Sequence, residues 1–179
     1  MEFETAVIEH IRNVVEKTSD VRQKYATAFV TAVAVVENYV RLAMTEDKPR
    51  EEIVCTAGCD ACCKGLMGEN LTLTEAEFVC ITEVVGKKRF EFNGGCPLLE
   101  DGKCSVYLYR PIVCRAMNSF DANWCKKPPL IYSIGPEGNA PVYYPQYHIT
   151  MAVSRALSAA LNQKQFRLVD KLKETKWQT

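Results

Sequence analysis

The chain has 179 residues, of which 47% are hydrophobic and 25% are charged, the composition of an ordinary globular protein. At this length we expect a single domain over residues 1–179 that can bury a core without help from metals or disulfides. The 22 basic and 22 acidic side chains give a formal net charge of zero. Because nucleic-acid-binding proteins usually carry a basic excess, we expect no nucleic-acid partner.

The N-terminus and the apolar segments bear on where the protein resides. Residues 1–4 are acidic, where a signal peptide would be basic and then apolar. The most apolar stretch, 26–36, covers about 11 residues, well short of the roughly 20 that cross a bilayer. We therefore expect a cytoplasmic protein without a membrane partner.

The N-terminal part, 1–48, is predicted to form two helices. Apolar side chains recur at helical spacing over about 3–17 and again over about 20–45. A polar cluster that ends in Asp20 separates the two patterns and supplies an N-cap, and Pro49 follows the second pattern.

Three further elements are expected in the second half of the chain. Thr74 and Glu77 form a capping box, which predicts a helix over about 75–86. Residues 130–144, with a run of Gly, Pro and Asn at their centre, predict one small β-hairpin. Apolar residues at helical spacing predict C-terminal helices within 149–175.

Nine cysteines, all within 55–125, are the anomaly of this sequence. In a reducing compartment, cysteines at close and regular spacing indicate metal ligands or redox groups rather than disulfides. The predicted fold class is therefore mainly α, with helical flanks around an irregular metal-binding centre at 55–125 and one small β-hairpin.

The first cysteine cluster, 55–63, has the spacing C-x3-C-x2-C-C. Gaps of two or three residues let a short stretch of backbone direct several thiolates at one metal at little entropic cost. Neighbouring side chains tend to point apart, so the two cysteines of the pair 62–63 are not expected to bind the same metal. Either Cys62 and Cys63 bind two different metals, or one of them is not a ligand.

The second cluster begins at Cys96, and a tight turn at 100–102 is expected to bring Cys96 and Cys104 together. Cys80 lies in the apolar stretch of the third predicted helix and is interpreted as a small buried hydrophobic residue. The remaining eight suit two four-thiolate sites or one such site with spare thiols. These candidate metal ligands are Cys55, Cys59, Cys62, Cys63, Cys96, Cys104, Cys114 and Cys125.

Arg110 and Arg115 flank Cys114 and are candidate cofactor-binding residues. They could offset the negative charge of thiolates or hold an anionic substrate, and the alternative is a surface arginine or an ion pair. His10 and His148 lie far from the cysteines in sequence and are predicted to be structural.

Three elements in this order resemble the YkgJ-type cysteine-cluster family, whose CxxCxxCC domain is described as zinc- or iron-chelating. They are the cysteine run at 55–63, the segment 96–107 with CPL and GKCSVY, and the segment RPIVCR at 110–115. The first gap is x3 here, where the commonest family pattern has x2. The resemblance covers about 55–115 and implies metal binding by these cysteines, and family members are often described as iron–sulfur oxidoreductases.

Four thiolates suit either zinc or an iron–sulfur cluster. The lack of a histidine near the cysteines favours iron, since 4Fe–4S clusters are usually held by cysteine alone. We predict an iron–sulfur protein, with 4Fe–4S as cofactor and zinc as the alternative, that has a redox or electron-transfer role. Its partner would be an unidentified redox protein or small-molecule substrate.

Two other functions stay open at this stage: a zinc-binding structural or interaction module without catalysis, and a metal-dependent modifying enzyme. No catalytic residue is predicted, and formation of a homo-oligomer also stays open.

Overall fold

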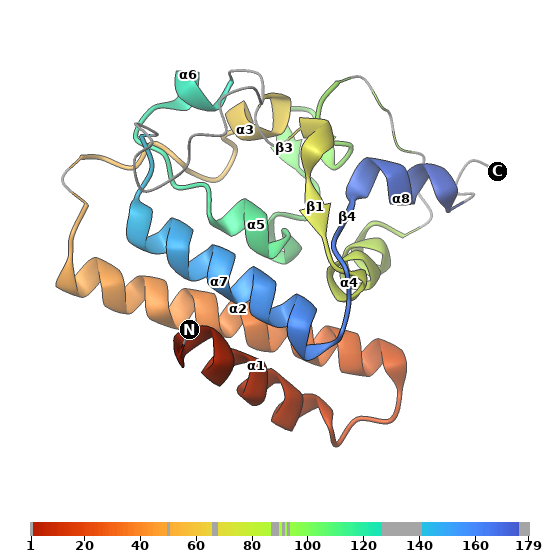
Figure 1. Ribbon diagram of the computed structural model, residues 1–179. Helices are drawn as coiled ribbons and strands as arrows, with labels where there is room; N and C mark the ends of the chain where they lie inside the picture. Colours follow the sequence, from red (N-terminus) through yellow and green to blue (C-terminus); the bar gives the residue numbers. More distant parts are fainter. Residues whose placement is uncertain are drawn as a thin grey trace.

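The structure, a computed structural model, describes residues 2–49, 51–65, 68–86, 90, 92, 94–126 and 141–175. The described chain is mostly helical with two short pairs of antiparallel strands (Figure 1), which confirms the predicted fold class. Most of the hairpin predicted at 130–144 lies outside the described residues. Where that segment is described, Val142 pairs with Ser119 and Tyr144 begins a helix. The single-domain organisation stays a prediction.

Three long helices form a layer that is seen at the bottom of Figure 1: α1 (Glu2–Val15), α2 (Val21–Glu46) and α7 (Tyr144–Ala160). The first two confirm the helices predicted from apolar spacing, and Asp20 caps α2 by accepting a hydrogen bond from the Gln23 N–H. Each helix contacts the other two. Their shared core contains Val7, Ile11, Val15, Ala28, Phe29, Ala32, Val36, Val40, Val153, Ala156 and Leu157.

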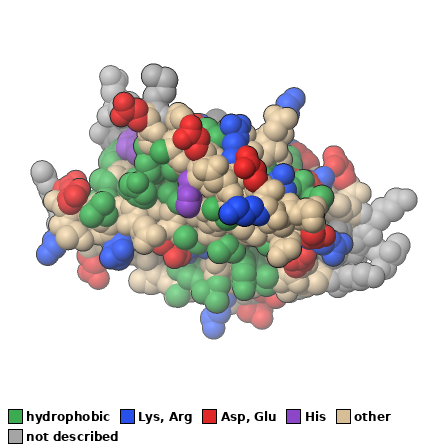
Figure 2. All heavy atoms as spheres, turned by 90° about the horizontal axis from the view of Figure 1, so that it is seen from below, with side chains coloured by type: hydrophobic (Ala, Val, Ile, Leu, Met, Phe, Trp, Pro, Cys, Tyr) green, Lys and Arg blue, Asp and Glu red, His purple; other side chains and the backbone are tan. Residues whose placement is uncertain are grey.

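Helix α2 is 26 residues long and, by length and composition alone, apolar enough to cross a membrane. It also contacts α1, α4 and α7, as the core helix of a folded domain does. Figure 2 views the molecule from below and shows hydrophobic side chains on this outer face, and Val30, Tyr39 and Leu42 of α2 are exposed. The absence of a membrane partner stays a prediction.

Helix α4 (Glu75–Val85) begins with the predicted capping box and ends at Gly86, which has a φ of 62°. The Glu77 side chain is 1% exposed, and its Oε2 accepts hydrogen bonds from the N–H and the hydroxyl of Thr74 at 2.7 and 2.8 Å. Its Oε1 accepts from the N–H of Ile112 at 2.8 Å, at the start of α5 (Ile112–Arg115). One buried carboxylate therefore holds the first turns of two helices that are far apart in sequence.

Short elements fill the space above the helical layer. They are α3 (Ala61–Lys64), the 3-10 helices η1 (Gly68–Asn70) and η2 (Tyr107–Tyr109), α6 (Ala122–Cys125), α8 (Leu168–Glu174), and the strands β1 (Thr72–Leu73), β2 (Leu99–Glu100), β3 (Lys103–Cys104) and β4 (Phe166–Arg167). Strands β2 and β3 pair across Asp101 and Gly102, both at positive φ, which confirms the predicted tight turn. Strand β1 pairs with β4, which contains Phe166. The apolar spacing within 149–175 predicted a helix at this position, and this part of the prediction was wrong.

Replacing the buried carboxylate tests its importance. We expect Glu77→Gln to lower the free energy of unfolding by about 2 kcal/mol, because the amide cannot accept hydrogen bonds from Thr74 and Ile112 together. Urea denaturation at pH 7 measures this change. Glu83→Gln, on the exposed side of the same helix, is the matched control and should cost less than about 0.5 kcal/mol. Equal unfolding midpoints for the two variants would contradict this role.

The same substitution has a defined pH dependence. Burial raises the pKa of Glu77 above its ordinary value, although hydrogen bonds from Thr74 and Ile112 oppose the shift. The native state therefore keeps this proton to a higher pH than the unfolded state does. As the pH rises from the unfolded-state pKa of Glu77 to its native-state pKa, the contribution of Glu77 to the free energy of unfolding decreases. The difference in the free energy of unfolding between wild type and Glu77→Gln should then be larger near the unfolded-state pKa than near the native-state pKa.

Candidate metal centre

Seven of the eight candidate cysteines line one cavity of about 80 Å³, in the part of Figure 1 where α3, α5 and β3 lie together. A water molecule needs roughly 10–15 Å³ by the same measure, so the cavity has room for a group of several atoms. Leu71, Leu98 and Met117 contribute apolar surface to its wall. The lining cysteines are Cys55, Cys59, Cys62, Cys63, Cys96, Cys104 and Cys114.

The eighth candidate, Cys125, reaches the cysteine cluster through a contact between α6 and α3. Gly65 follows the last residue of α3, and a Cβ atom there would lie 2.4 Å from the carbonyl oxygen of Cys125. Because glycine has no side chain, the two short helices can pack directly on one another. Cys125 consequently packs with Cys59 and Cys62, and it is 2% exposed.

Four other cysteines pack together on a different side. Cys63, Cys96, Cys104 and Cys114 belong to one apolar cluster, which includes Leu71 and Leu98. The N–H of Cys96 donates a 2.8 Å hydrogen bond to the carbonyl oxygen of Cys63, so the first and second sequence clusters are joined at this point.

Ser119 supports two of the thiols, although nothing in the sequence pattern marks it. Its N–H donates to Sγ of Cys55 at 3.1 Å, and its hydroxyl interacts with the thiol of Cys125. The Ser119 carbonyl accepts the N–H of Val54 at 3.0 Å, which fixes the chain just before Cys55. Hydrogen bonds to sulfur are among the factors that tune thiolate-bound clusters.

Burial and neighbouring thiols raise the pKa values of several of these cysteines. Burial, followed by the thiols of Cys62, Cys63 and Cys104, raises the pKa of Cys114 well above its ordinary value. A hydrogen bond to Cys63, followed by burial, raises the pKa of Cys62. Metal coordination removes the protons of such thiols, so metal binding here would release protons and weaken as the pH falls.

Arg110 supplies positive charge to the cavity wall. Its guanidinium lies 4.4 Å from the centre of the Tyr107 ring, and its charge lowers the pKa values of Cys55, Cys104 and Cys114 against the larger effect of burial. Its Nε atom is buried and has no hydrogen-bond partner among the described residues. This position suits a cation that offsets the charge of thiolates.

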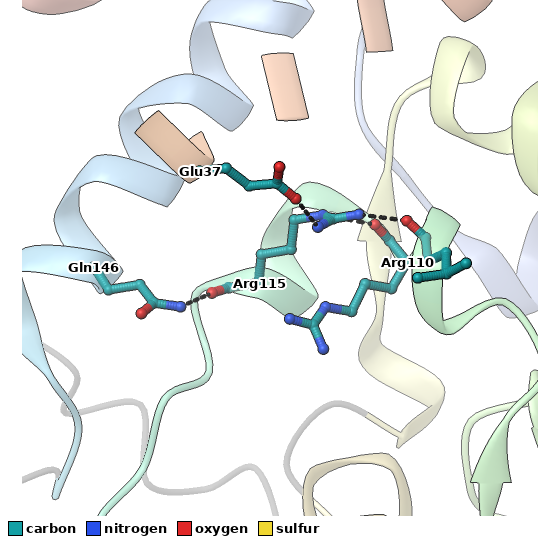
Figure 3. A network of polar contacts seen from close by, with 5 residues as sticks. Glu37, Arg110, Arg115 and Gln146 are labelled. Atoms are coloured by element: carbon teal, nitrogen blue, oxygen red, sulfur yellow. Dashed lines mark hydrogen bonds and ion pairs between the residues drawn. The ribbon is translucent and has the colours of Figure 1, made fainter. Parts of the chain in front are cut away.

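Arg115 is 8% exposed and is not among the residues that line the cavity. It donates hydrogen bonds to the carbonyl oxygens of Leu108 at 2.7 Å and Arg110 at 3.3 Å, and it pairs with Glu37 of α2 at 3.3 Å (Figure 3). The structure thus gives Arg115 a positioning role for the segment that carries Arg110. The cofactor-binding roles of both arginines stay predictions.

Cys80 and the two histidines, none of which was predicted to be a ligand, do not line the cavity. Cys80 packs in the core of the helical layer, and burial raises its pKa to about 11. His10 is exposed on α1, and His148 lies against Tyr144 on α7. Thr56 and Asn118 line the cavity without having been predicted, since a polar loop residue carries no recognisable sequence signal.

No three His, Cys, Asp or Glu side chains among the described residues converge as closely as bound ligands do. The fit to a metal therefore depends on the donor set: thiols of seven cysteines around one cavity, with an eighth thiol packed beside them. Such a donor set suits zinc and iron–sulfur clusters.

Comparison with protein families supports this donor set. Residues 54–130 match the family model CxxCxxCC, described as "Putative zinc- or iron-chelating domain". The match covers the whole cysteine-rich centre and supports metal binding, with zinc and iron as the two metals named. Neither the curated proteins nor the solved structures gave a match to the chain.

The contact between α3 and α6 can be tested at Gly65. We expect Gly65→Ala to cost roughly 1–3 kcal/mol by overpacking, because the nearest atoms belong to backbone that must shift. Alkylation of Cys125 in the metal-free protein, followed by mass spectrometry, should become about tenfold faster or more. Lys64→Ala, at the exposed neighbouring position, is the control, and an unchanged alkylation rate in Gly65→Ala would refute the contact.

The ion pair of Arg115 and Glu37 predicts an unequal effect of its two partners. Glu37 is 66% exposed in its side chain, so Glu37→Gln should cost less than about 1 kcal/mol. Arg115→Gln should cost about 2–3 kcal/mol, because it removes the charged donor of two part-buried hydrogen bonds to carbonyl oxygens. Urea denaturation of both variants measures the difference, and equal losses would show that the exposed ion pair carries the stability.

Proposed function

We propose that this protein binds an iron–sulfur cluster, most simply 4Fe–4S, and has a redox or electron-transfer role in the cytoplasm. The observation that carries the proposal is the cavity lined by seven cysteine side chains, with neither histidine of the sequence in its wall. All-cysteine coordination is usual for 4Fe–4S clusters.

The surrounding side chains suit a charged redox group. Leu71, Leu98 and Met117 contribute apolar surface to the cavity wall. Arg110 and the N–H of Ser119 place positive charge beside thiol sulfurs. A bound cluster supplies a redox couple, and these contacts would raise its reduction potential because they stabilise the reduced, more negative state.

The exposed segment η2 offers a route for electrons or a small substrate to the cavity. Tyr107 lines the cavity and belongs to η2, whose side chains are exposed. A redox partner that contacts η2 would therefore approach the cysteines closely.

Zinc is the second candidate, and the lengths of the local helices favour it. Helices α3, α5 and α6 have four residues each, far fewer than the roughly 12–15 that an isolated helix needs for stability. A redox-silent metal that joins these helices would stabilise a structural or interaction module.

Purification without air distinguishes the two metals. An iron–sulfur protein should be brown, with broad visible absorption and about four irons and four acid-labile sulfides per cluster. A colourless protein with one or two zinc ions would support the zinc module and eliminate the redox proposal. Metal analysis that finds neither element would overturn both.

Metal removal supplies a second measurement. Chelation should increase hydrogen exchange in 55–125 more than in α1 and α2, because the metal holds the centre and the apolar core holds the helices. Cys104→Ser should lower the metal content, and Cys80→Ser, in the helical core, should leave it unchanged.

A further inference from the structure

We propose that the eight cysteines form two adjacent four-thiolate sites whose membership crosses the order of the sequence. Site A comprises Cys55, Cys59, Cys62 and Cys125, and site B comprises Cys63, Cys96, Cys104 and Cys114. The inference deepens the proposed metal-binding function and rests on it. Grouping by sequence clusters would instead keep Cys63 with site A and Cys125 with site B.

The packing of α6 against α3 brings Cys125 into site A. Cys59, Cys62 and Cys125 pack in one small cluster with Ala61 and Met117, which is separate from the cluster that contains Cys63. Steric access at Gly65 permits this contact.

Ser119 provides an independent connection within site A. It donates its N–H to Sγ of Cys55, and a hydrogen-bond interaction with its side chain lowers the pKa of the Cys125 thiol against the larger effect of burial. These two cysteines are 70 residues apart in sequence, and one serine interacts with both. Burial is the main reason why the pKa of Cys125 is raised, and the neighbouring thiols that add to it are Cys55, Cys62 and Cys59.

Site B is assembled around the backbone hydrogen bond from Cys96 to Cys63. The tight turn after Glu100 returns the chain so that Cys104 pairs with Leu99, close to Cys96. Cys114 enters from α5, whose first turn is held by Glu77. All four cysteines of site B pack in one apolar cluster.

The packing of Cys62 and Cys63 into different apolar clusters assigns them to different sites. Both lie on α3, where consecutive residues of a helix are about 100° apart around the axis. Cys62 packs on the α6 side and Cys63 on the side of Cys96. Their thiols still share a hydrogen bond, and Cys62 also raises the pKa values of Cys104 and Cys114. The two sites therefore adjoin in one cavity, and Arg110 acts on thiols of both.

Coordination needs no oxidant in this scheme. Each ligating thiol forms one bond from sulfur to metal and releases its proton to solvent. Zinc ions added to the reduced, metal-free chain are therefore a sufficient probe of the grouping, whichever metal the protein carries in the cell.

Pairs of substitutions distinguish crossed from sequential grouping. Wild type and the control Cys80→Ser should bind about two zinc ions per chain. Cys59→Ser with Cys125→Ser, both in site A, should leave about one, and Cys104→Ser with Cys125→Ser, which damages both sites, should leave about none. Sequential grouping predicts the reverse for these two double variants. Elemental analysis after gel filtration gives the counts, and far-ultraviolet circular dichroism checks the fold.

A measurement on the unmodified chain covers variants that fail to fold. Zinc-loaded wild type is treated with limiting chelator and alkylated, and mass spectrometry identifies which cysteines lose protection together. The inference requires Cys125 to become alkylated together with Cys59, and not together with Cys104. It also requires Cys63 to become alkylated together with Cys96. Sequential groups, or one shared cluster in which every cysteine reacts together, would overturn it and leave metal binding intact. Absence of any zinc binding by wild type would overturn the proposed function as well.

Discussion

The carboxylate of Glu77 is the contact on which the organisation of the centre depends. Glu77 lies in the first turn of α4 and is buried. Its carboxylate accepts hydrogen bonds from Thr74 and from Ile112 at the start of α5. A helix of four residues has too few internal hydrogen bonds to be stable alone, so α5 requires such external partners. Cys114 and Arg115 take their positions from α5, and Arg115 in turn holds the segment that carries Arg110.

The two halves of the molecule are stabilised by different means. Helices α1, α2 and α7 share an apolar core, into which Cys80 of α4 packs as one more buried hydrophobic side chain. The cysteine-rich centre has short helices, and Cys125, Cys62 and Cys59 occupy much of its smaller apolar cluster. Because thiols contribute little hydrophobic surface, coordination of a metal is the interaction that would couple these elements most strongly.

The electrostatic balance of the centre follows from the same arrangement. Buried thiols favour their neutral forms, and each negative thiolate adjacent to others raises the cost of the next. Arg110, which lies over the Tyr107 ring, and the N–H of Ser119 reduce this cost. Bound metal cations would complete the compensation.

The sequence alone determined the features that depend on nearby residues. Apolar spacing placed α1 and α2, the Thr74–Glu77 capping box placed α4, and residues 100–102 predicted the turn between β2 and β3. The spacing of the first cysteines also indicated metal binding, because closure of a short loop depends on local chain length alone.

Tertiary structure decided which cysteines are neighbours. Cys125 packs with Cys59 and Cys62 because Gly65 has no side chain that would keep α3 and α6 apart. Ser119 donates a hydrogen bond to Cys55, which lies 64 positions away in sequence. Arg115, predicted beside Arg110, faces Glu37 of a distant helix instead of the cavity. These contacts join residues with no local pattern in common, and only the packing of separate elements brings them together, so spacing along the chain could not reveal them.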